Sequence, residues 1–223
     1  MGQRRMKILG LVDIHSRLEK LEDLLWEAED VDVVLLGGDI TNFGRRESSE
    51  AVIIPLLERA PCLFGVIGNC DYPEVEESLI AHDCHLEGKP RQIGGIGIIG
   101  VGGSLPCPSQ TPYERSEQEL KGALSRQLAA LTQKESLVAV VHQPPLETAL
   151  DKALLGGHVG SQAVRAFIEE YEPILFFSGH IHESKAVQQI GKTTLVNPGP
   201  FMKGNYFVAE IIGNEVSVEL RKM

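Results

Sequence analysis

Five runs of apolar, strand-forming residues each end in a short polar motif, and this pattern limits the fold more than any other feature of the chain. The runs cover residues 8–12, 33–36, 63–67, 137–141 and 174–177. The motifs that follow them are Asp13-Ile14-His15, Gly38-Asp39, Gly68-Asn69, His142 and Gly179-His180-Ile181-His182. Because ligands of open α/β sheets bind at the carboxyl ends of the strands, we expect these polar side chains to share one rim.

Seven side chains on that rim can ligate metal ions. They are Asp13, His15, Asp39, Asn69, His142, His180 and His182. Burying so many polar groups is costly unless each has a partner, and no fold needs them for its stability. Two divalent cations would supply the partners. A mixture of Asp, Asn and His ligands suits Mn, Fe, Zn, Ni or Co and excludes a thiolate-type site.

The spacing of these residues indicates how two metals could share them. Asp13 and His15 are two residues apart, so their side chains point the same way if the strand conformation continues. Asp39 has two carboxylate oxygens and could bridge the metals. Two metals about 3.5–4 Å apart can hold one hydroxide for in-line attack on phosphorus and neutralise the charge of the transition state. The sequence therefore favours a phosphohydrolase that forms no covalent intermediate.

The rest of the sequence predicts one α/β domain over residues 1–223. Strand and helix patterns alternate along the first two-thirds of the chain, and Ser161 is a candidate N-cap for one of the helices. After His182 the pattern turns to hairpins, which pair residues 184–190 with 193–196 and residues 205–212 with 215–220. Mixed helices and strands that end in hairpins predict two stacked sheets with helices outside.

Composition narrows the range of partners. The net charge is −10 and the basic residues are scattered, which argues against a face that binds duplex nucleic acid. A small anionic phosphoester fits, because bound cations make a site positive even in an acidic protein. No apolar run approaches the roughly 18 residues that span a bilayer, and the first strand begins too early for a signal peptide. We expect a cytoplasmic protein with reduced cysteines, and the sequence leaves homo-oligomers open.

In order and spacing, the five motifs resemble those of the calcineurin-like metallophosphoesterase family, from Lys7 to about Pro200. The resemblance implies a four-layer α/β/β/α sandwich of two mixed sheets flanked by helices. It also implies a binuclear centre, with manganese as the first expectation. By the family pattern, one metal binds Asp13, His15, Asp39 and His182. The other metal binds Asp39, Asn69, His142 and His180.

One motif departs from the family pattern. The family usually has Gly-Asn-His followed by an acidic residue, whereas this chain has Gly68-Asn69-Cys70-Asp71, as in a small bacterial and archaeal branch associated with phosphodiesterase activity. A neutral cysteine supplies no positive partner for phosphate, and this loss should harm a dianionic monoester more than a monoanionic diester. We therefore expect a phosphodiesterase. His158, on the Gly-rich loop 156–161, is a candidate for the missing acid.

Several alternatives stay open at this point. A phosphomonoesterase, a nuclease or a catalytically weak protein-binding scaffold could share the same motifs. His158 could equally be a solvated loop histidine, and Asp71 could cap the helix that begins near Pro73 or support the site from behind. Arg17 and Arg45 follow ligand motifs, where they could contact phosphate or simply face solvent.

Overall fold

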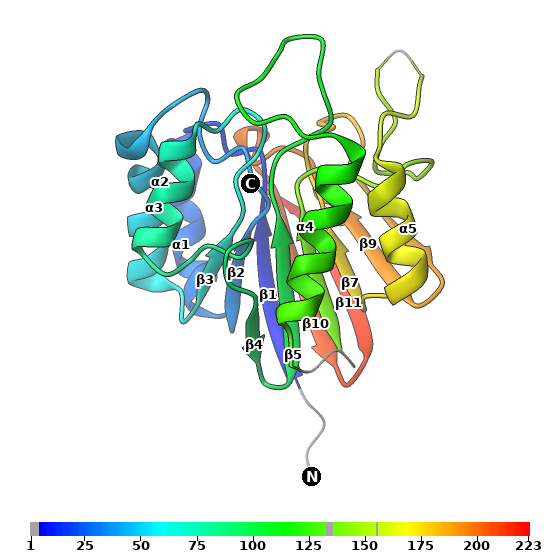
Figure 1. The fold of residues 1–223 in the computed structure, drawn as a ribbon. Coiled ribbons are helices and arrows are strands. Elements are labelled where there is room, and N and C mark those ends of the chain that lie inside the picture. Colours follow the sequence, from blue (N-terminus) through cyan, green and yellow to red (C-terminus); the bar gives the residue numbers. More distant parts are fainter. Residues whose placement is uncertain (1–4, 133–135, 155) are drawn as a thin grey trace.

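Two β-sheets packed face to face between two layers of helices form the structure, a computed structural model that describes residues 5–132, 136–154 and 156–223 (Figure 1). The first sheet has the strand order β11-β10-β1-β2-β3 and the second has the order β4-β5-β6-β7-β9-β8. Strands β1, β2 and β3 are mutually parallel, as are β5, β6, β7 and β9. Strand β10 is antiparallel to both of its neighbours, and β4 and β8 are antiparallel to β5 and β9. The predicted sandwich of two mixed sheets is confirmed.

The elements follow one another along the chain in the expected alternation. The strands of the first sheet are β1 (Arg5–Leu11), β2 (Val33–Leu36), β3 (Leu63–Gly65), β10 (Asn205–Ile212) and β11 (Glu215–Lys222). Those of the second are β4 (Arg91–Ile93), β5 (Ile96–Val101), β6 (Leu137–Val141), β7 (Leu175–Phe177), β8 (Ala186–Ile190) and β9 (Thr193–Asn197). The helices are α1 (Leu21–Glu29), α2 (Arg46–Arg59), α3 (Pro73–Ala81), α4 (Glu117–Ala130) and α5 (Gln162–Tyr171), with short 3-10 turns at Leu18–Lys20 and Phe201–Lys203.

Three apolar clusters separate the four layers. Alternate side chains of β1 point to opposite faces, so Leu9 packs toward the helices while Ile8 packs between the sheets. The first cluster joins the first sheet to α1, α2 and α3, and the second fills the space between the sheets. The third joins the second sheet to α4 and α5. Because the central strands β2, β5 and β6 are buried on both faces, a polar site is expected at the strand ends.

Close packing between the sheets depends on Gly10. A Cβ atom at this position would lie 1.9 Å from Cε1 of Phe207, which sits on the neighbouring strand β10. The Phe207 ring meets the Phe177 ring of the other sheet edge to face, with 4.8 Å between centroids. The glycine therefore makes room for the aromatic pair that joins the sheets.

The local predictions after His182 are also confirmed. Strands β8 and β9 form one hairpin and β10 and β11 form another. Ser161 caps α5, because its hydroxyl accepts a hydrogen bond from the backbone of Val164 at 3.1 Å. All four cysteines are free thiols. None of the helices described in the structure is long and apolar enough to cross a membrane.

Candidate metal centre

The polar motifs meet at one end of the sandwich, where strands of both sheets end. Asp13 follows β1, Asp39 follows β2 and Asn69 follows β3 in the first sheet. His142 follows β6 and His180 follows β7 in the second sheet. The rim that the sequence predicts is therefore assembled from two sheets, and it depends on how they stack.

A first cluster of ligand atoms is formed by Asp13, His15 and His182. Nε2 of His15 lies 3.4 Å from Nε2 of His182, which in turn lies 3.7 Å from Oδ1 of Asp13. Oδ2 of Asp13 is buried and has no hydrogen-bond partner among the residues described. Because a buried polar atom without a partner is costly, this donor set fits a divalent cation.

A second cluster contains Asn69, His142 and His180. The Nδ1 of His142 lies 2.8 Å from the carbonyl of Gly37, so Nδ1 carries the proton and Nε2 presents its lone pair. That lone pair faces the amide oxygen of Asn69 at 3.0 Å. The rings of His142 and His180 lie beside each other, with 5.3 Å between centroids. Two acceptors turned toward each other are unfavourable alone, and a cation between them would satisfy both.

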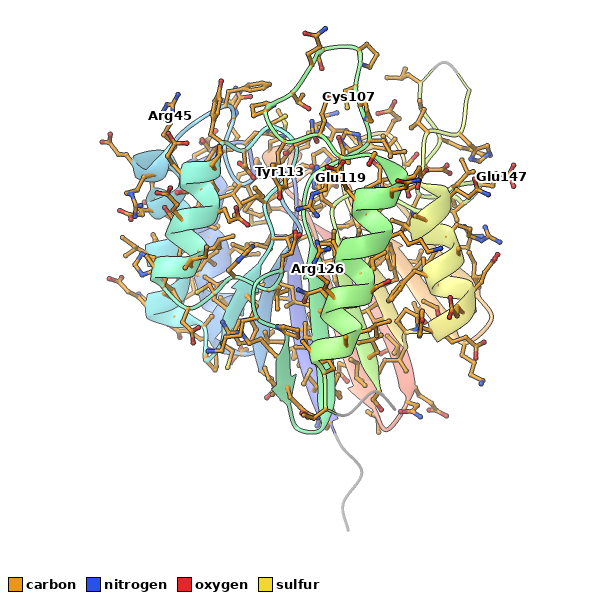
Figure 2. All side chains as sticks on the ribbon, viewed as in Figure 1. Arg45, Cys107, Tyr113, Glu119, Arg126 and Glu147 are labelled. Atoms are coloured by element: carbon orange, nitrogen blue, oxygen red, sulfur yellow. The ribbon has the colours of Figure 1, made fainter. Side chains whose placement is uncertain are left out.

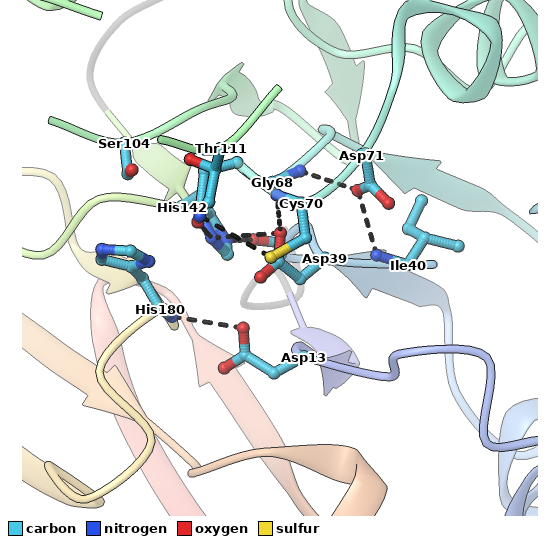
Figure 3. Close-up of polar contacts among 12 residues, drawn as sticks. Asp13, Asp39, Ile40, Gly68, Cys70, Asp71, Ser104, Thr111, His142 and His180 are labelled. Carbon is cyan, nitrogen blue, oxygen red and sulfur yellow. Dashed lines mark hydrogen bonds and ion pairs between the residues drawn. The ribbon is translucent and has the colours of Figure 1, made fainter. Parts of the chain in front are cut away.

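Asp39 lies between the two clusters. Its Oδ2 is 3.7 Å from Nε2 of His15, and its Oδ1 is 3.6 Å from Nε2 of His142. The backbone N–H of Cys70 donates to Oδ1 at 2.8 Å and fixes the carboxylate (Figure 3). Each carboxylate oxygen thus faces one cluster, as a ligand shared by two metals would require.

The backbone that carries these side chains is unusual. Four of the seven candidate ligands have left-handed φ angles: Asp13 at 53°, His15 at 48°, Asp39 at 48° and His180 at 66°. The strand conformation therefore does not continue through Asp13 and His15, and the condition under which the sequence placed their side chains on one side is not met. Strand β1 ends at Leu11, and hydrogen bonds from Asp13 N to Gly38 O (3.1 Å) and from His15 N to Asp39 O (3.0 Å) hold the turn. Backbone strain of this kind is typical of functional sites. It directs side chains to positions that they could not reach from a regular strand.

Asp71 fixes the two loops that carry Asp39 and Asn69. It is fully buried, and its carboxylate accepts backbone hydrogen bonds from Ile40 (3.0 Å), Thr41 (2.8 Å) and Gly68 (2.9 Å), as Figure 3 shows in part. The hydroxyl of Thr41 donates a fourth at 2.8 Å. Helix α3 has no side-chain cap, so Asp71 supports the rim and does not cap that helix.

The glycine in the Gly68-Asn69 motif has a steric role at the same place. A Cβ atom on Gly68 would lie 2.0 Å from Oδ1 of Asp39. Only glycine therefore allows the segment after β3 to approach the carboxylate of Asp39 this closely.

The loop between β5 and α4 lies beside the second cluster, a position that the sequence analysis did not predict. Its Gly103 and Tyr113 donate backbone hydrogen bonds to the carbonyls of Ile67 and Asn69, each at 3.1 Å. Figure 2 shows Cys107 on this loop, and its Sγ lies 3.7 Å from Nε2 of His180. A cysteine in a Pro-rich loop has no local pattern that would indicate this proximity.

The structure places the other predicted residues in different surroundings. Nδ1 of His158 is 2.7 Å from Oδ1 of the buried Asp151, and no hydrogen bond or ion pair among the described residues joins His158 to the seven candidate ligands. Arg45 forms an ion pair with Glu74 and lies over the ring of Tyr72, 4.7 Å from its centroid. Arg45 thus has partners of its own, whereas the side chain of Arg17 forms no hydrogen bond or ion pair with the residues described.

The protonation of the clusters predicts how metal affinity depends on pH. Burial lowers the pKa of His15 and His142 and brings that of His180 to about 3, so these rings are neutral and ready to ligate. Burial and the nearby Asp13 raise the pKa of Asp39 to about 6, and Asp13 also raises the pKa of His182. These last two groups must lose protons to bind metal. We expect Mn²⁺ to bind at least about tenfold more weakly at pH 5 than at pH 7.5.

Titration calorimetry of the chelator-treated protein at the two pH values would measure this difference. Affinity that is the same at both would show that neither Asp39 nor His182 gives up a proton on binding.

Comparisons with known proteins agree with this geometry. The calcineurin-like phosphoesterase family model matches residues 6–184 of the chain. An uncharacterized protein of Methanocaldococcus jannaschii is 35% identical over 219 residues, which cover 96% of each chain.

Solved structures share the fold at low identity. A protein of Thermus thermophilus superposes with a TM-score of 0.75 at 19% identity, over 96% of this chain and 98% of that one. A dimetal phosphatase from Danio rerio superposes with a TM-score of 0.65 at 11% identity, over 97% of this chain and 96% of that one.

Proposed function

The chain belongs to the calcineurin-like phosphoesterase family and is a metal-dependent phosphoesterase, and from this premise we propose that it is a phosphodiesterase with two divalent cations at its rim. The observation that carries the proposal is the position of Asp39, whose two oxygens face two separate ligand clusters at 3.7 and 3.6 Å. One cation would bind Asp13, His15, Asp39 and His182. The other would bind Asp39, Asn69, His142 and His180. Manganese is our first choice because the family resemblance implies it, and the mixed oxygen and imidazole ligands of both sets would also suit Fe, Zn, Ni or Co.

Bound cations would supply an activated water and neutralise the phosphoryl oxygens. The chain itself supplies the positioning. The carbonyl of Gly37 holds His142 in the tautomer whose Nε2 is free to ligate. The N–H of Cys70 holds the carboxylate of Asp39 in place, and Asp71 holds the backbone of both loops. Groups fixed before substrate arrives need no reorganisation during the reaction.

The test is hydrolysis of two chromogenic substrates by protein that has been stripped of metal and reloaded with manganese. Bis(4-nitrophenyl) phosphate reports diester cleavage and 4-nitrophenyl phosphate reports monoester cleavage. We expect a higher kcat/KM for the diester. A higher value for the monoester would make the protein a phosphomonoesterase, and bound metal without turnover of either compound would favour a scaffold.

The diester preference rests on Cys70. Burial and the carboxylate of Asp39 raise the pKa of this thiol far above its usual value, so Cys70 is neutral and offers substrate no positive charge. We predict that Cys70→His raises the monoester-to-diester ratio of kcat/KM by about tenfold, the size of one additional charge-assisted hydrogen bond.

Cys70→Ser is the matched control for this prediction, because it introduces no charge. Metal content measured on both variants separates a change in preference from a change in loading. An unchanged ratio in Cys70→His would refute this account of substrate choice.

We propose His158 as the proton donor to the leaving group. The buried Asp151 carboxylate orients its ring through Nδ1, which leaves Nε2 available. The loop that carries it is attached beside the His180–His182 motif, since Leu154 N donates to the carboxylate of Glu183 at 2.7 Å and Ser184 Oγ donates to Lys152 O at 2.6 Å.

For His158→Ala we predict a loss of about 10²-fold in turnover of an alkyl diester, whose leaving group needs a proton. Turnover of a 4-nitrophenyl diester, whose leaving group is stable as an anion, should change much less. Metal content should stay the same, and His82→Ala serves as the control. Equal losses on both substrates, or no loss on either, would remove His158 from this role.

A further inference from the structure

A pocket of about 650 Å³ opens beside the first ligand cluster. Most of the residues that line it are neither proposed metal ligands nor the proposed acid. The residues that line it are His15, Ser16, Arg17, Asn42, Ser48, His182, Met202 and Lys203. Two of these are proposed metal ligands, so a substrate whose phosphoryl group sits at the rim could extend into this pocket. The volume is in the range of small-molecule sites.

The charge of this pocket is opposite to that of the protein. The chain has 31 acidic and 21 basic residues, yet the eight lining residues include Arg17 and Lys203 and no carboxylate. Among the described residues, no carboxylate lies within 4.0 Å of the charged group of Arg17 or Lys203. In contrast, Arg45 and Arg46 form ion pairs with Glu74 and Glu77. Lys203 lines the same pocket as His182. Two unpaired cations beside a phosphoester site point to an anion.

The backbone fixes both cations to the strand end that carries the ligands. Arg17 is two residues after His15, in a turn closed by a hydrogen bond from its N–H to Ile14 O at 3.1 Å. Lys203 ends the 3-10 turn Phe201–Lys203, in which Phe201 N donates to Val12 O at 2.8 Å and Met202 N donates to Asp13 O at 3.1 Å. The side chains are exposed and free to reach a ligand, but their Cα atoms are held against the rim.

We propose that Arg17 and Lys203 form a second anion-binding subsite, which selects phosphodiesters that carry an additional phosphate on the part of the molecule lying in this pocket. The inference rests on the proposed phosphodiesterase function and names its substrate class. Guanidinium pairs with phosphate through two parallel hydrogen bonds and ammonium adds a point charge, so together they favour a phosphate over a neutral group. Ser16, Ser48 and Asn42 offer further polar contacts in the same pocket.

The kinetic test compares thymidine 5′-(4-nitrophenyl phosphate) with the same compound bearing a 3′-phosphate. Both release nitrophenolate, and they differ only in the additional phosphate. We expect the bisphosphorylated compound to have a kcat/KM at least about tenfold higher, as two charge-assisted contacts in a solvated pocket would give. The preference should fall below about threefold in Arg17→Ala/Lys203→Ala and should weaken as salt is added.

Matched variants separate this role from a general effect of charge. Lys121→Ala/Arg126→Ala removes two positive charges from α4 and should keep the preference, because neither residue lines the pocket. Arg17→Lys should retain part of it. A wild-type preference near unity, or one that the double alanine variant leaves unchanged, would overturn the subsite.

A binding measurement keeps this inference separate from the proposed function. Calorimetry on metal-loaded protein compares thymidine 3′,5′-bisphosphate with thymidine 5′-monophosphate, and turnover is not needed. The subsite is supported if the bisphosphate binds more tightly and if Arg17→Ala/Lys203→Ala abolishes this difference. This conclusion holds even if neither diester is cleaved. Failure to cleave either diester would refute only the phosphodiesterase function. Equal binding of the two nucleotides would overturn the subsite even if both diesters are cleaved.

Discussion

Asp39→Asn is expected to lower kcat/KM for a diester by at least about 10³-fold, the upper end of the cost of losing one preorganised transition-state group. In wild type, one carboxylate oxygen of Asp39 faces His15 and the other faces His142. The substitution keeps the size of the side chain but removes its charge and one of these two oxygens. One amide oxygen cannot serve both clusters. We therefore also expect bound manganese, measured by elemental analysis, to fall from two ions per chain toward one or none.

Thermal unfolding distinguishes this effect from damage to the fold. Burial and Asp13 hold the pKa of Asp39 at about 6, above its usual value, so the ionised carboxylate destabilises the metal-free protein at neutral pH. Metal-free Asp39→Asn should therefore unfold at the same or a higher temperature than metal-free wild type, yet it should gain little from added manganese. Asp23→Asn, on an exposed turn of α1, should behave as wild type. A variant that keeps both metals and its activity would exclude Asp39 as the shared ligand.

The second large effect is expected at Asp71, whose side chain is fully buried. Asp71→Ala leaves the buried donors of Ile40, Thr41 and Gly68 without their acceptor. Each buried donor without a partner costs about 1–3 kcal/mol, so we expect the free energy of unfolding to fall by about 3 kcal/mol or more. Manganese affinity should fall as well, because the loops that place Asp39 and Asn69 lose their common anchor.

Urea unfolding of metal-free protein measures this loss, with Asp23→Ala as the exposed control. The free energy of unfolding of Asp71→Asn should lie between those of wild type and Asp71→Ala. The amide keeps one acceptor oxygen, but its NH₂ group is a donor that faces the other N–H groups. An Asp71→Ala protein with wild-type stability and metal affinity would show that the loops hold their positions without the carboxylate.

Local sequence was enough to predict the strand ends and the chemistry they carry. An apolar run followed by Asp, Asn or His predicts where a chain leaves a buried strand, because an uncompensated polar side chain is not tolerated inside the sheet. This reasoning found all five motifs and the two hairpins after His182. It could not predict the backbone at Asp13 and His15, where hydrogen bonds to the loop after β2 accompany left-handed φ angles that no local pattern indicates.

The sequence by itself determined the layered fold and the identity of the seven candidate ligands, since strand periodicity and residue type are local properties of the chain. Only the tertiary structure decided that Asp39 lies between the two clusters, that Asp71 anchors two loops, and that Arg17 and Lys203 meet in one pocket. The most distant of these residues, Arg17 and Lys203, are 186 positions apart in the chain. They arise because two separately built sheets bury a common apolar face and thereby bring their strand ends together.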